Sequence, residues 1–202
     1  MNICYIVGAG DFAYPFVPKE NDLVIAADGG YDHLSVRGIR CDLLIGDLDS
    51  IITPHENVET IRHSVEKDDT DMYLAFKKGL EMGYTEFRIY GAGGGRCDHT
   101  LANYSLLLYT KENGANARIV TSDFLISLIK DEGARLYGNA GSTFSVFAFG
   151  GDAVGVDIKG AKYETDNATL KMNFPLGVSN SFLDGAVDVS VKSGALLIMQ
   201  EI

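Results

Sequence analysis

Acidic residues gather in three short clusters in the first half of the chain, and these clusters hold the residues best suited to chemistry. They read GDLDS at 46–50, KDDTD at 67–71 and GGGRCDH at 93–99. Each lies where an apolar run ends and a helix-like segment begins. In an open α/β sheet that is the carboxyl end of a strand, where ligands bind. Several carboxylates beside a glycine loop with an arginine indicate Mg²⁺ and a phosphorylated ligand, and therefore phosphoryl chemistry.

The first cluster offers Asp47 and Asp49, which are two residues apart. Residues i and i+2 of a strand point to the same side, so both carboxylates can face one ligand if the extended conformation persists. Alternatively, one aspartate is a turn residue and Ser50 caps a helix. The motif alone does not choose between these interpretations.

The second cluster places Asp68, Asp69 and Asp71 at the start of a predicted helix. Carboxylates in a first turn also stabilise the helix dipole, which explains one or two of them without a ligand. Asp28 ends another apolar run and would line the same sheet edge as Asp47. Two like charges about 4 Å apart repel by about 4 kcal/mol at an effective dielectric constant of about 20. Converging carboxylates therefore indicate a divalent cation, and oxygen ligands favour Mg²⁺ over Zn²⁺.

The third cluster contains a glycine loop, residues 91–96, between a predicted strand and a predicted helix. Glycines let backbone N–H groups approach an anion, and a helix N-terminus is electropositive. No Gly-Lys-Ser/Thr follows, so the loop is not a Walker A motif. Arg96 adds a bidentate phosphate binder, and Asp98 and His99 add polar groups, although His99 could equally be a cap or a stacking residue. Another glycine turn, GAGD at 8–11, also follows a strand and could be a tight turn only.

Strands and helices alternate through the first part of the chain. The predicted strands are 2–7, 23–27, 42–46, 58–62, 86–90 and 117–121, and the clearest predicted helices are 70–82 and 99–111. This alternation predicts an α/β domain over residues 1–121 with a mainly parallel, doubly wound, Rossmann-like sheet.

After Ser122 the pattern changes to short strands separated by turns. The predicted strands are 124–129, 134–137, 143–149, 154–158, 169–173, 187–191 and 196–200, with turns at 131–133, 150–152, 184–185 and 193–194. Apolar and polar residues alternate between Val187 and Val191, as in a half-buried antiparallel strand. Residues 122–202 are therefore predicted to form an all-β sandwich or jelly roll.

Bulk properties exclude several classes of function. The net charge of −11 argues against a nucleic-acid partner, because duplex binding needs a basic surface. No apolar run reaches the roughly 18–20 residues of a membrane span, and the first residues read as a strand rather than a signal peptide. Three cysteines without pair spacing predict a reduced, cytoplasmic setting.

Taken in order, the motifs resemble those of the thiamine pyrophosphokinase family. The matching motifs are DGG at 28–30, GDLDS at 46–50, D-x-TD at 68–71, GGR-x-DH at 94–99, NATL at 167–170 and GVSN at 177–180. The resemblance implies an α/β domain joined to a β-sandwich, in a homodimer with active sites at the subunit interface. It also implies transfer of the pyrophosphoryl group of ATP to the hydroxyl group of thiamine, giving thiamine diphosphate and AMP.

The resemblance further implies roles for particular residues. Mg²⁺ would be held by Asp47, Asp49 and Asp71, and the acidic catalytic site would be completed by Asp28, Asp68 and Asp98. ATP would be contacted by Gly29, Gly93, Gly94, Gly95, Arg96 and His99, with Arg96 also stabilising the transition state. Thiamine would be bound by Ser179 and Asn180, with Phe182 as the nearest aromatic residue in a chain that has no tryptophan.

The thiamine hydroxyl would attack the β-phosphorus in line, and either Asp71 or Asp98 would accept its proton. Three alternatives remain open. One is a diphosphokinase for another hydroxymethyl heterocycle such as a pterin. Another is a Mg²⁺-dependent nucleotide hydrolase, and the third is a non-catalytic nucleotide or vitamin sensor.

Overall fold

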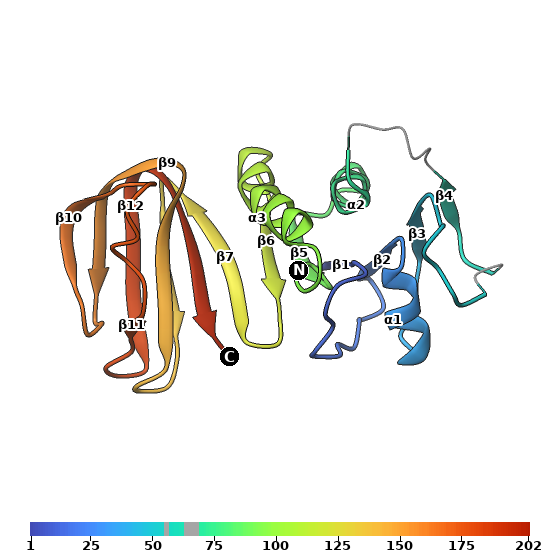
Figure 1. The fold of residues 1–202 in the computed structure, drawn as a ribbon, viewed down its shortest axis with the longest axis horizontal. Coiled ribbons are helices and arrows are strands. Elements are labelled where there is room, and N and C mark those ends of the chain that lie inside the picture. The colour runs from blue at the N-terminus through green and yellow to red at the C-terminus, as the bar shows by residue number, and fades with distance from the viewer. Residues whose placement is uncertain (55–56, 63–68) are drawn as a thin grey trace. The chain divides into compact units, whose positions relative to one another are not determined.

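The computed structural model of the chain describes residues 1–54, 57–62 and 69–202 (Figure 1). These residues form two compact units, Met1–Ser122 and Asp123–Ile202. None of the helices found in them has the length and apolarity that a membrane span requires.

The first unit is built on a parallel sheet. Its described strands are β1 (Cys4–Val7), β2 (Leu23–Ala27), β3 (Leu43–Gly46), β4 (Thr60–Arg62), β5 (Glu86–Tyr90) and β6 (Asn116–Val120). They lie in the order β6-β5-β1-β2-β3-β4, and each neighbouring pair is parallel. The chain runs outward from β1 to β4 and then returns to the other side of β1. The order therefore reverses between β1 and β5, which is where such sheets bind ligands.

Helices cover both faces of this sheet. The described helices are α1 (Gly30–Val36), α2 (Asp71–Glu81) and α3 (Cys97–Glu112). Figure 1 shows α2 and α3 on one face and α1 on the other. Every residue of β1, β2 and β3 is buried, as expected for parallel strands enclosed by two layers of helix. The predicted doubly wound α/β architecture is confirmed.

Gly79 allows α2 to lie close to the sheet. A Cβ atom at Gly79 would lie 2.7 Å from the Phe87 ring and 2.8 Å from the Cys4 sulfur. The helix begins after Thr70, whose Oγ1 accepts a hydrogen bond from the Tyr73 N–H at 3.3 Å. This cap fixes where Asp71, the first helical residue, leaves the sheet edge.

The second unit is an antiparallel β-sandwich. Its strands are β7 (Phe124–Lys130), β8 (Gly133–Tyr137), β9 (Thr143–Lys159), β10 (Thr165–Leu170), β11 (Asn180–Ser181) and β12 (Ala186–Glu201). The two long strands, β9 and β12, pair along most of their length. The first half of β12 also pairs with β8 and its second half with β7, while β9 pairs with β11 at its start and β10 at its end. Each long strand therefore belongs to both sheets, and their apolar side chains form one core between them.

Two predicted turns in this unit are wrong, because the chain bends there without reversing. Strands predicted at 143–149 and 154–158 are one strand, β9, and those at 187–191 and 196–200 are one strand, β12. Gly150 has φ +76° and Gly194 has φ +104°, and the register of the β9–β12 pair shifts next to Gly194. Glycine supplies the left-handed conformation of a bulge as readily as that of a turn, so the pattern alone does not separate them.

Candidate functional site

Three carboxylates meet at the carboxyl ends of β2 and β3. Asp28 follows β2 directly and Asp47 follows β3 directly, and Asp49 lies two residues further on. One carboxylate oxygen from each lies within 4.8 Å of the others. Because β2 and β3 are parallel neighbours, their carboxyl ends share one edge. Gly46 permits the close approach, since a Cβ atom there would lie 3.1 Å from the Asp28 Cβ.

The first cluster converges through a turn rather than through an extended strand. Leu48 has φ +70°, a left-handed conformation, and the Asp49 N–H donates a hydrogen bond to Asp47 Oδ1 at 3.1 Å. The extended conformation, which was the condition for the first interpretation of this motif, therefore does not continue past Gly46, although the two carboxylates do meet. Ser50 begins no helix; its hydroxyl donates a hydrogen bond to Asp28 Oδ2. Asp28 itself has φ +49°, and such strained non-glycine residues concentrate at functional sites.

The electrostatics of this group suit a cation. The charge on Asp47 raises the pKa of Asp49, and desolvation, Asp28 and Asp71 raise it further. Asp28 Oδ1 is buried and accepts no hydrogen bond from any described residue. Unsatisfied buried acceptors are rare in folded proteins. A hard divalent cation with oxygen ligands would satisfy Asp28 Oδ1 and offset the repulsion, so these residues fit Mg²⁺.

Asp32, which the sequence reasoning missed, holds the loop that carries Asp47 and Asp49. From the first turn of α1, its carboxylate accepts hydrogen bonds from the Ile52 N–H at 3.1 Å and the Thr53 N–H at 2.8 Å. Desolvation raises the pKa of Asp32, but the hydrogen bonds from these two residues outweigh it and lower the pKa below its ordinary value. Its place just after the Gly29-Gly30 pair was the only signal in the sequence.

The structure divides the second acidic cluster. Asp71 lies within electrostatic range of Asp49. The Asp69 carboxylate instead forms an ion pair with the Lys77 ammonium group at 2.6 Å. Asp68 lies outside the described residues. Of this cluster, Asp71 is therefore the residue that the structure connects to the carboxylates of β2 and β3.

Arg96 and Asp98 form an exposed ion pair with each other. Arg96 Nη2 lies 2.7 Å from Asp98 Oδ2, and Arg96 Nε donates to Asp98 Oδ1 at 3.2 Å. The hydrogen bond from Arg96 is the main cause that lowers the pKa of Asp98 to about 2. His99 is exposed at the same helix start. A phosphate ligand would have to compete with Asp98 for the guanidinium group.

The loops after β1 and β5 lie against each other where the strand order reverses. The Gly10 N–H donates to the Gly91 carbonyl at 2.9 Å, and the Asp11 N–H to the Gly93 carbonyl at 2.8 Å. A cavity of about 420 Å³ opens beside them, and we call it the switch-point cavity. It is lined by Ala9, Gly10, Asp11, Phe12, Ala13, His33, Gly94, Gly95 and Ser122.

In the second unit, Ser179 is exposed and has φ +58°, whereas Asn180 is buried. The Asn180 amide binds the backbone of Tyr163 on both sides: Oδ1 accepts from the Tyr163 N–H at 3.0 Å, and Nδ2 donates to its carbonyl at 2.7 Å. Phe182 is 1% exposed and packs on Phe144, with ring centroids 5.0 Å apart. Stacking of Phe182 on a ligand would require the ring to leave this core.

Comparison with known proteins identifies two family matches along the sequence. Residues 16–119 match "Thiamin pyrophosphokinase, catalytic domain" and residues 126–196 match "Thiamin pyrophosphokinase, vitamin B1 binding domain". The thiamine pyrophosphokinase of Bacillus subtilis (strain 168) is 28% identical over 195 residues, with 90% of this chain and 88% of that protein covered.

Solved structures share the fold. The thiamine pyrophosphokinase of Bacillus subtilis superposes with a TM-score of 0.85 at 23% identity, covering 100% of this chain and 99% of that chain. A thiamin pyrophosphokinase family protein from Enterococcus faecalis gives 0.86 at 24%, with the same coverage. The enzyme from Candida albicans gives 0.79 at 15%, covering 100% and 89%. At these identities the likeness concerns the fold.

Proposed function

The chain belongs to the thiamine pyrophosphokinase family, and on this premise we propose that it transfers the pyrophosphoryl group of ATP to thiamine in a Mg²⁺-dependent reaction. The products are thiamine diphosphate and AMP. Two observations carry the metal and nucleotide part of this proposal. The carboxylates of Asp28, Asp47 and Asp49 converge, and Asp28 has a buried carboxylate oxygen with no hydrogen-bond partner among the described residues.

Asp47, Asp49 and Asp71 hold Mg²⁺, and Asp28 and Asp68 complete the acidic site. Mg²⁺ held by these residues would supply the positive charge that offsets the charge on the triphosphate. Gly29, Gly93, Gly94 and Gly95 leave the backbone open to the phosphates, with His99 nearby.

Arg96 stabilises charge that develops in the transition state. Its guanidinium group is exposed, and Asp98 is its only side-chain partner among the described residues. The thiamine hydroxyl attacks the β-phosphorus in line, and AMP leaves. We assign Asp71 to accept the hydroxyl proton. Asp98 is poorly suited to accept the proton, since its ion pair with Arg96 lowers its pKa to about 2. Asp98 instead positions Arg96 until ATP binds.

Thiamine binding is assigned to residues 122–202, and metal and nucleotide binding to residues 1–121. The match of residues 126–196 to a vitamin B1 binding domain supports this division. Ser179 supplies an exposed hydroxyl, and Asn180 fixes the backbone next to it. Phe182 contributes to thiamine binding from within the core, two residues after Asn180.

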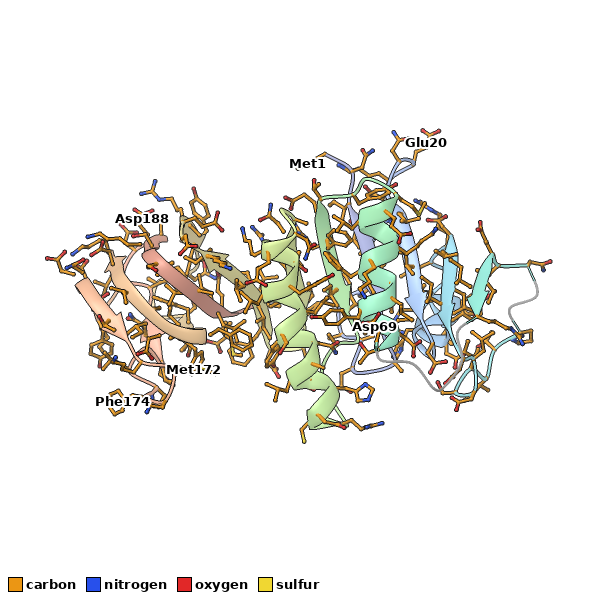
Figure 2. The ribbon with its side chains drawn as sticks, turned by 90° about the horizontal axis from the view of Figure 1, so that it is seen from above. Met1, Glu20, Asp69, Met172, Phe174 and Asp188 are labelled. Carbon is orange, nitrogen blue, oxygen red and sulfur yellow. The ribbon has the colours of Figure 1, made fainter. Side chains whose placement is uncertain are left out.

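The active unit is a homodimer with its active sites at the subunit interface. Support comes from an apolar loop of the second unit, where Met172 is 60% and Phe174 is 61% exposed, with Leu176 and Val178 also exposed (Figure 2). Exposed apolar patches of this kind mark interaction surfaces. The three cysteines are free thiols, which supports the cytoplasm as the compartment.

An assay of AMP release tests the function. The protein is incubated with ATP and Mg²⁺, with and without thiamine, and thiamine diphosphate is detected by mass spectrometry. We expect AMP only with thiamine, in amounts equal to thiamine diphosphate. AMP or ADP without an acceptor would instead identify a hydrolase, and AMP only with a pterin alcohol would identify another diphosphokinase. No turnover with any acceptor, together with tight nucleotide binding, would identify a sensor.

A further inference from the structure

Asp47 and Asp49 lie on a loop, residues 47–54, that forms neither a helix nor a strand. Its apolar side chains, Leu48 and Ile51, are only partly buried against the core of the first unit. A metal site needs its ligands held in one geometry, and ligands on a loop depend on supporting contacts from outside the loop. Something outside the loop therefore has to fix these two aspartates in place.

Asp32 provides this support. Its carboxylate uses one oxygen for each of the two bonds described above: Oδ2 accepts the Ile52 N–H and Oδ1 accepts the Thr53 N–H. Both oxygens are therefore engaged. Among the described residues, Asp32 is not one of the three carboxylates that meet within 4.8 Å. Residues that orient metal ligands without binding the metal have this kind of bonding.

The helix that carries Asp32 is itself fixed to the sheet. α1 begins at Gly30, where a Cβ atom would lie 1.8 Å from the Val7 carbonyl oxygen, so its first turn lies directly against β1. One turn further on, Leu34 is fully buried in the core of the first unit. The Asp32 carboxylate is therefore a fixed point to which the loop is tied.

Two further contacts join the start of α1 to the same loop. The Ser50 hydroxyl binds the Asp28 carboxylate, and the Tyr31 hydroxyl donates to the Pro54 carbonyl at 3.4 Å. The first of these contacts uses a carboxylate that belongs to the acidic site, and the second is a long single bond. The Asp32 contact has two bonds and uses no carboxylate of the acidic site. It is therefore the contact that can hold the loop while a metal ion is bound.

We propose that Asp32 is a positioning residue of the metal site: it holds the loop so that Asp47 and Asp49 face Asp28, and it thereby sets the affinity for Mg²⁺. This assignment rests on the metal site of the function proposed above. Asp32 touches neither the metal nor the substrates. It restricts the loop, so the ligands lose less conformational freedom when the metal binds. Loosening the loop weakens metal binding and leaves the chemical step unchanged once the metal is bound.

The test compares two matched variants, Asp32→Asn and Asp22→Asn, with the wild type by calorimetric titration with Mg²⁺ alone. Asp22 precedes β2, and its carboxylate also accepts two backbone N–H groups, from Ile3 and Lys19, at 2.8 Å each. Asn keeps one acceptor oxygen, so each variant loses one of its two bonds. We expect Asp32→Asn to raise the Kd for Mg²⁺ about tenfold and Asp22→Asn to leave it unchanged.

The assay of AMP release supplies a second readout. Asp32→Asn should need about ten times more Mg²⁺ than the wild type for half of its maximal rate. Its kcat at saturating Mg²⁺ should stay within about twofold of the wild-type value, because the ligands themselves are intact. A fall in kcat that excess Mg²⁺ does not reverse would contradict a role in positioning alone.

A second pair of variants separates positioning from charge, because Asp32→Asn also removes a negative charge near the metal. Ile52→Pro keeps that charge but removes the N–H that Asp32 accepts. Ile52→Ala keeps the N–H and should behave as wild type, since the Ile52 side chain is 91% exposed. We expect Ile52→Pro to raise the Kd for Mg²⁺ about fivefold, as for the loss of one hydrogen bond. An unchanged Kd in Ile52→Pro would assign the effect of Asp32→Asn to charge and overturn the positioning role.

The outcomes separate this assignment from the proposed function. If the wild type binds Mg²⁺ and converts thiamine, but the Kd of Asp32→Asn is unchanged, the assignment is wrong and the function stands. If Asp32→Asn binds Mg²⁺ more weakly but the wild type shows no thiamine-dependent AMP, the assignment stands and the function is wrong. Equal weakening in Asp22→Asn would show a general loss of structure and overturn the assignment. No binding of Mg²⁺ to the wild type would overturn the metal site and the assignment together.

Discussion

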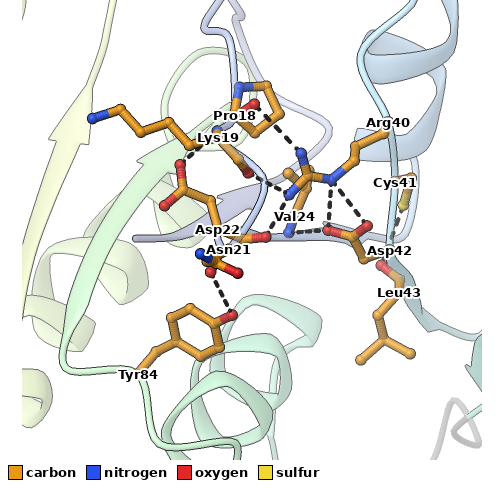
Figure 3. A network of polar contacts seen from close by, with 10 residues as sticks. All are labelled: Pro18, Lys19, Asn21, Asp22, Val24, Arg40, Cys41, Asp42, Leu43 and Tyr84. Carbon is orange, nitrogen blue, oxygen red and sulfur yellow. Dashed lines mark hydrogen bonds and ion pairs between the residues drawn. The ribbon is translucent and has the colours of Figure 1, made fainter. Parts of the chain in front are cut away.

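Aspartates at the two ends of the parallel sheet differ in how completely their carboxylates are hydrogen-bonded. At the amino end, Asp22 precedes β2 and Asp42 precedes β3, and both carboxylates are fully engaged (Figure 3). Asp42 accepts hydrogen bonds from Arg40 Nε at 3.1 Å and from the Val24 N–H at 2.8 Å. Arg40 also donates to backbone carbonyls of the preceding loop, at Pro18, Lys19 and Asp22.

Asp22 completes the network at the amino end. It is 7% exposed, and its carboxylate accepts the Ile3 N–H and the Lys19 N–H, each at 2.8 Å. At the carboxyl end of the same strands, Asp28, Asp47 and Asp49 repel one another, and one oxygen has no described partner. Carboxylates with complete hydrogen bonding hold a fold together, whereas incompletely bonded ones indicate where a ligand binds. The number of partners separates structural from functional aspartates here.

The largest expected effect is the loss of enzymatic activity when an aspartate at the carboxyl end of the sheet is replaced. Asp47→Asn should reduce thiamine-dependent AMP release roughly a hundredfold or more, because one charged ligand of the metal is lost. Tm should stay the same or rise, since a repulsive charge is removed. Asp188→Asn, an exposed aspartate of the second unit, serves as the control. Near-wild-type turnover in Asp47→Asn would remove this residue from the metal site, and Asp71→Asn tests the third ligand in the same way.

Mg²⁺ should stabilise the protein through the aspartates at the carboxyl end of the sheet and not through those at the amino end. Free Mg²⁺ at about a hundred times its Kd should raise the free energy of unfolding of the wild type by about 2.7 kcal/mol, and EDTA should reverse the gain. Asp47→Asn should gain much less, whereas Asp22→Asn should gain as much as the wild type. Equal gains in all three proteins, measured by urea titration, would place the ion elsewhere.

Loss of stability is expected at the amino end. Asp22→Ala should lower the free energy of unfolding by about 2 kcal/mol, because two backbone N–H groups lose their acceptor. The kcat of the folded fraction should not change. Asp22→Asn, which keeps one acceptor oxygen, should cost less. A loss of activity at full folding would contradict the separation of the two ends.

The smallest effect is expected at the exposed pair of Arg96 and Asp98, which is partnered but lies near solvent. The lowered pKa of Asp98 means that its ionised form is favoured in the folded protein. This stabilisation is present above the ordinary pKa of 3.8 and is lost as the pH falls toward about 2. The Tm of Asp98→Asn should therefore be slightly below that of the wild type at neutral pH and should approach it near pH 2. A constant difference across this range would show that the pair contributes nothing through charge.

Parts of the site were predictable because they follow from topology. Asp28 and Asp47 each end a buried strand, and neighbouring parallel strands end at one edge, so their meeting required no tertiary detail. The left-handed turn at Leu48 and the anchoring of the loop by Asp32 were not predictable. Both depend on contacts between residues about twenty positions apart or on a conformation that no propensity favours.

The fold, too, was predictable from the sequence only in part. Alternating strands and helices, followed by short strands alone, predicted an α/β sheet and a β-sandwich, and this is confirmed. The glycines at 150 and 194 were read as turns, since only the pairing partner distinguishes a bulge from a reversal. Phe182 follows the Ser179-Asn180 pair in sequence, yet its ring is buried because Gly138 leaves room for it.

The two strands that are shared between the sheets of the second unit determine how this unit unfolds. Because β9 and β12 each run through both sheets, neither sheet can separate from the other as an intact body. Hydrogen exchange of backbone amides should therefore report one opening free energy for residues 144–148 and 154–158, although they lie in different sheets. The bend at Gly194 thus makes a two-layered unit unfold as one cooperative element.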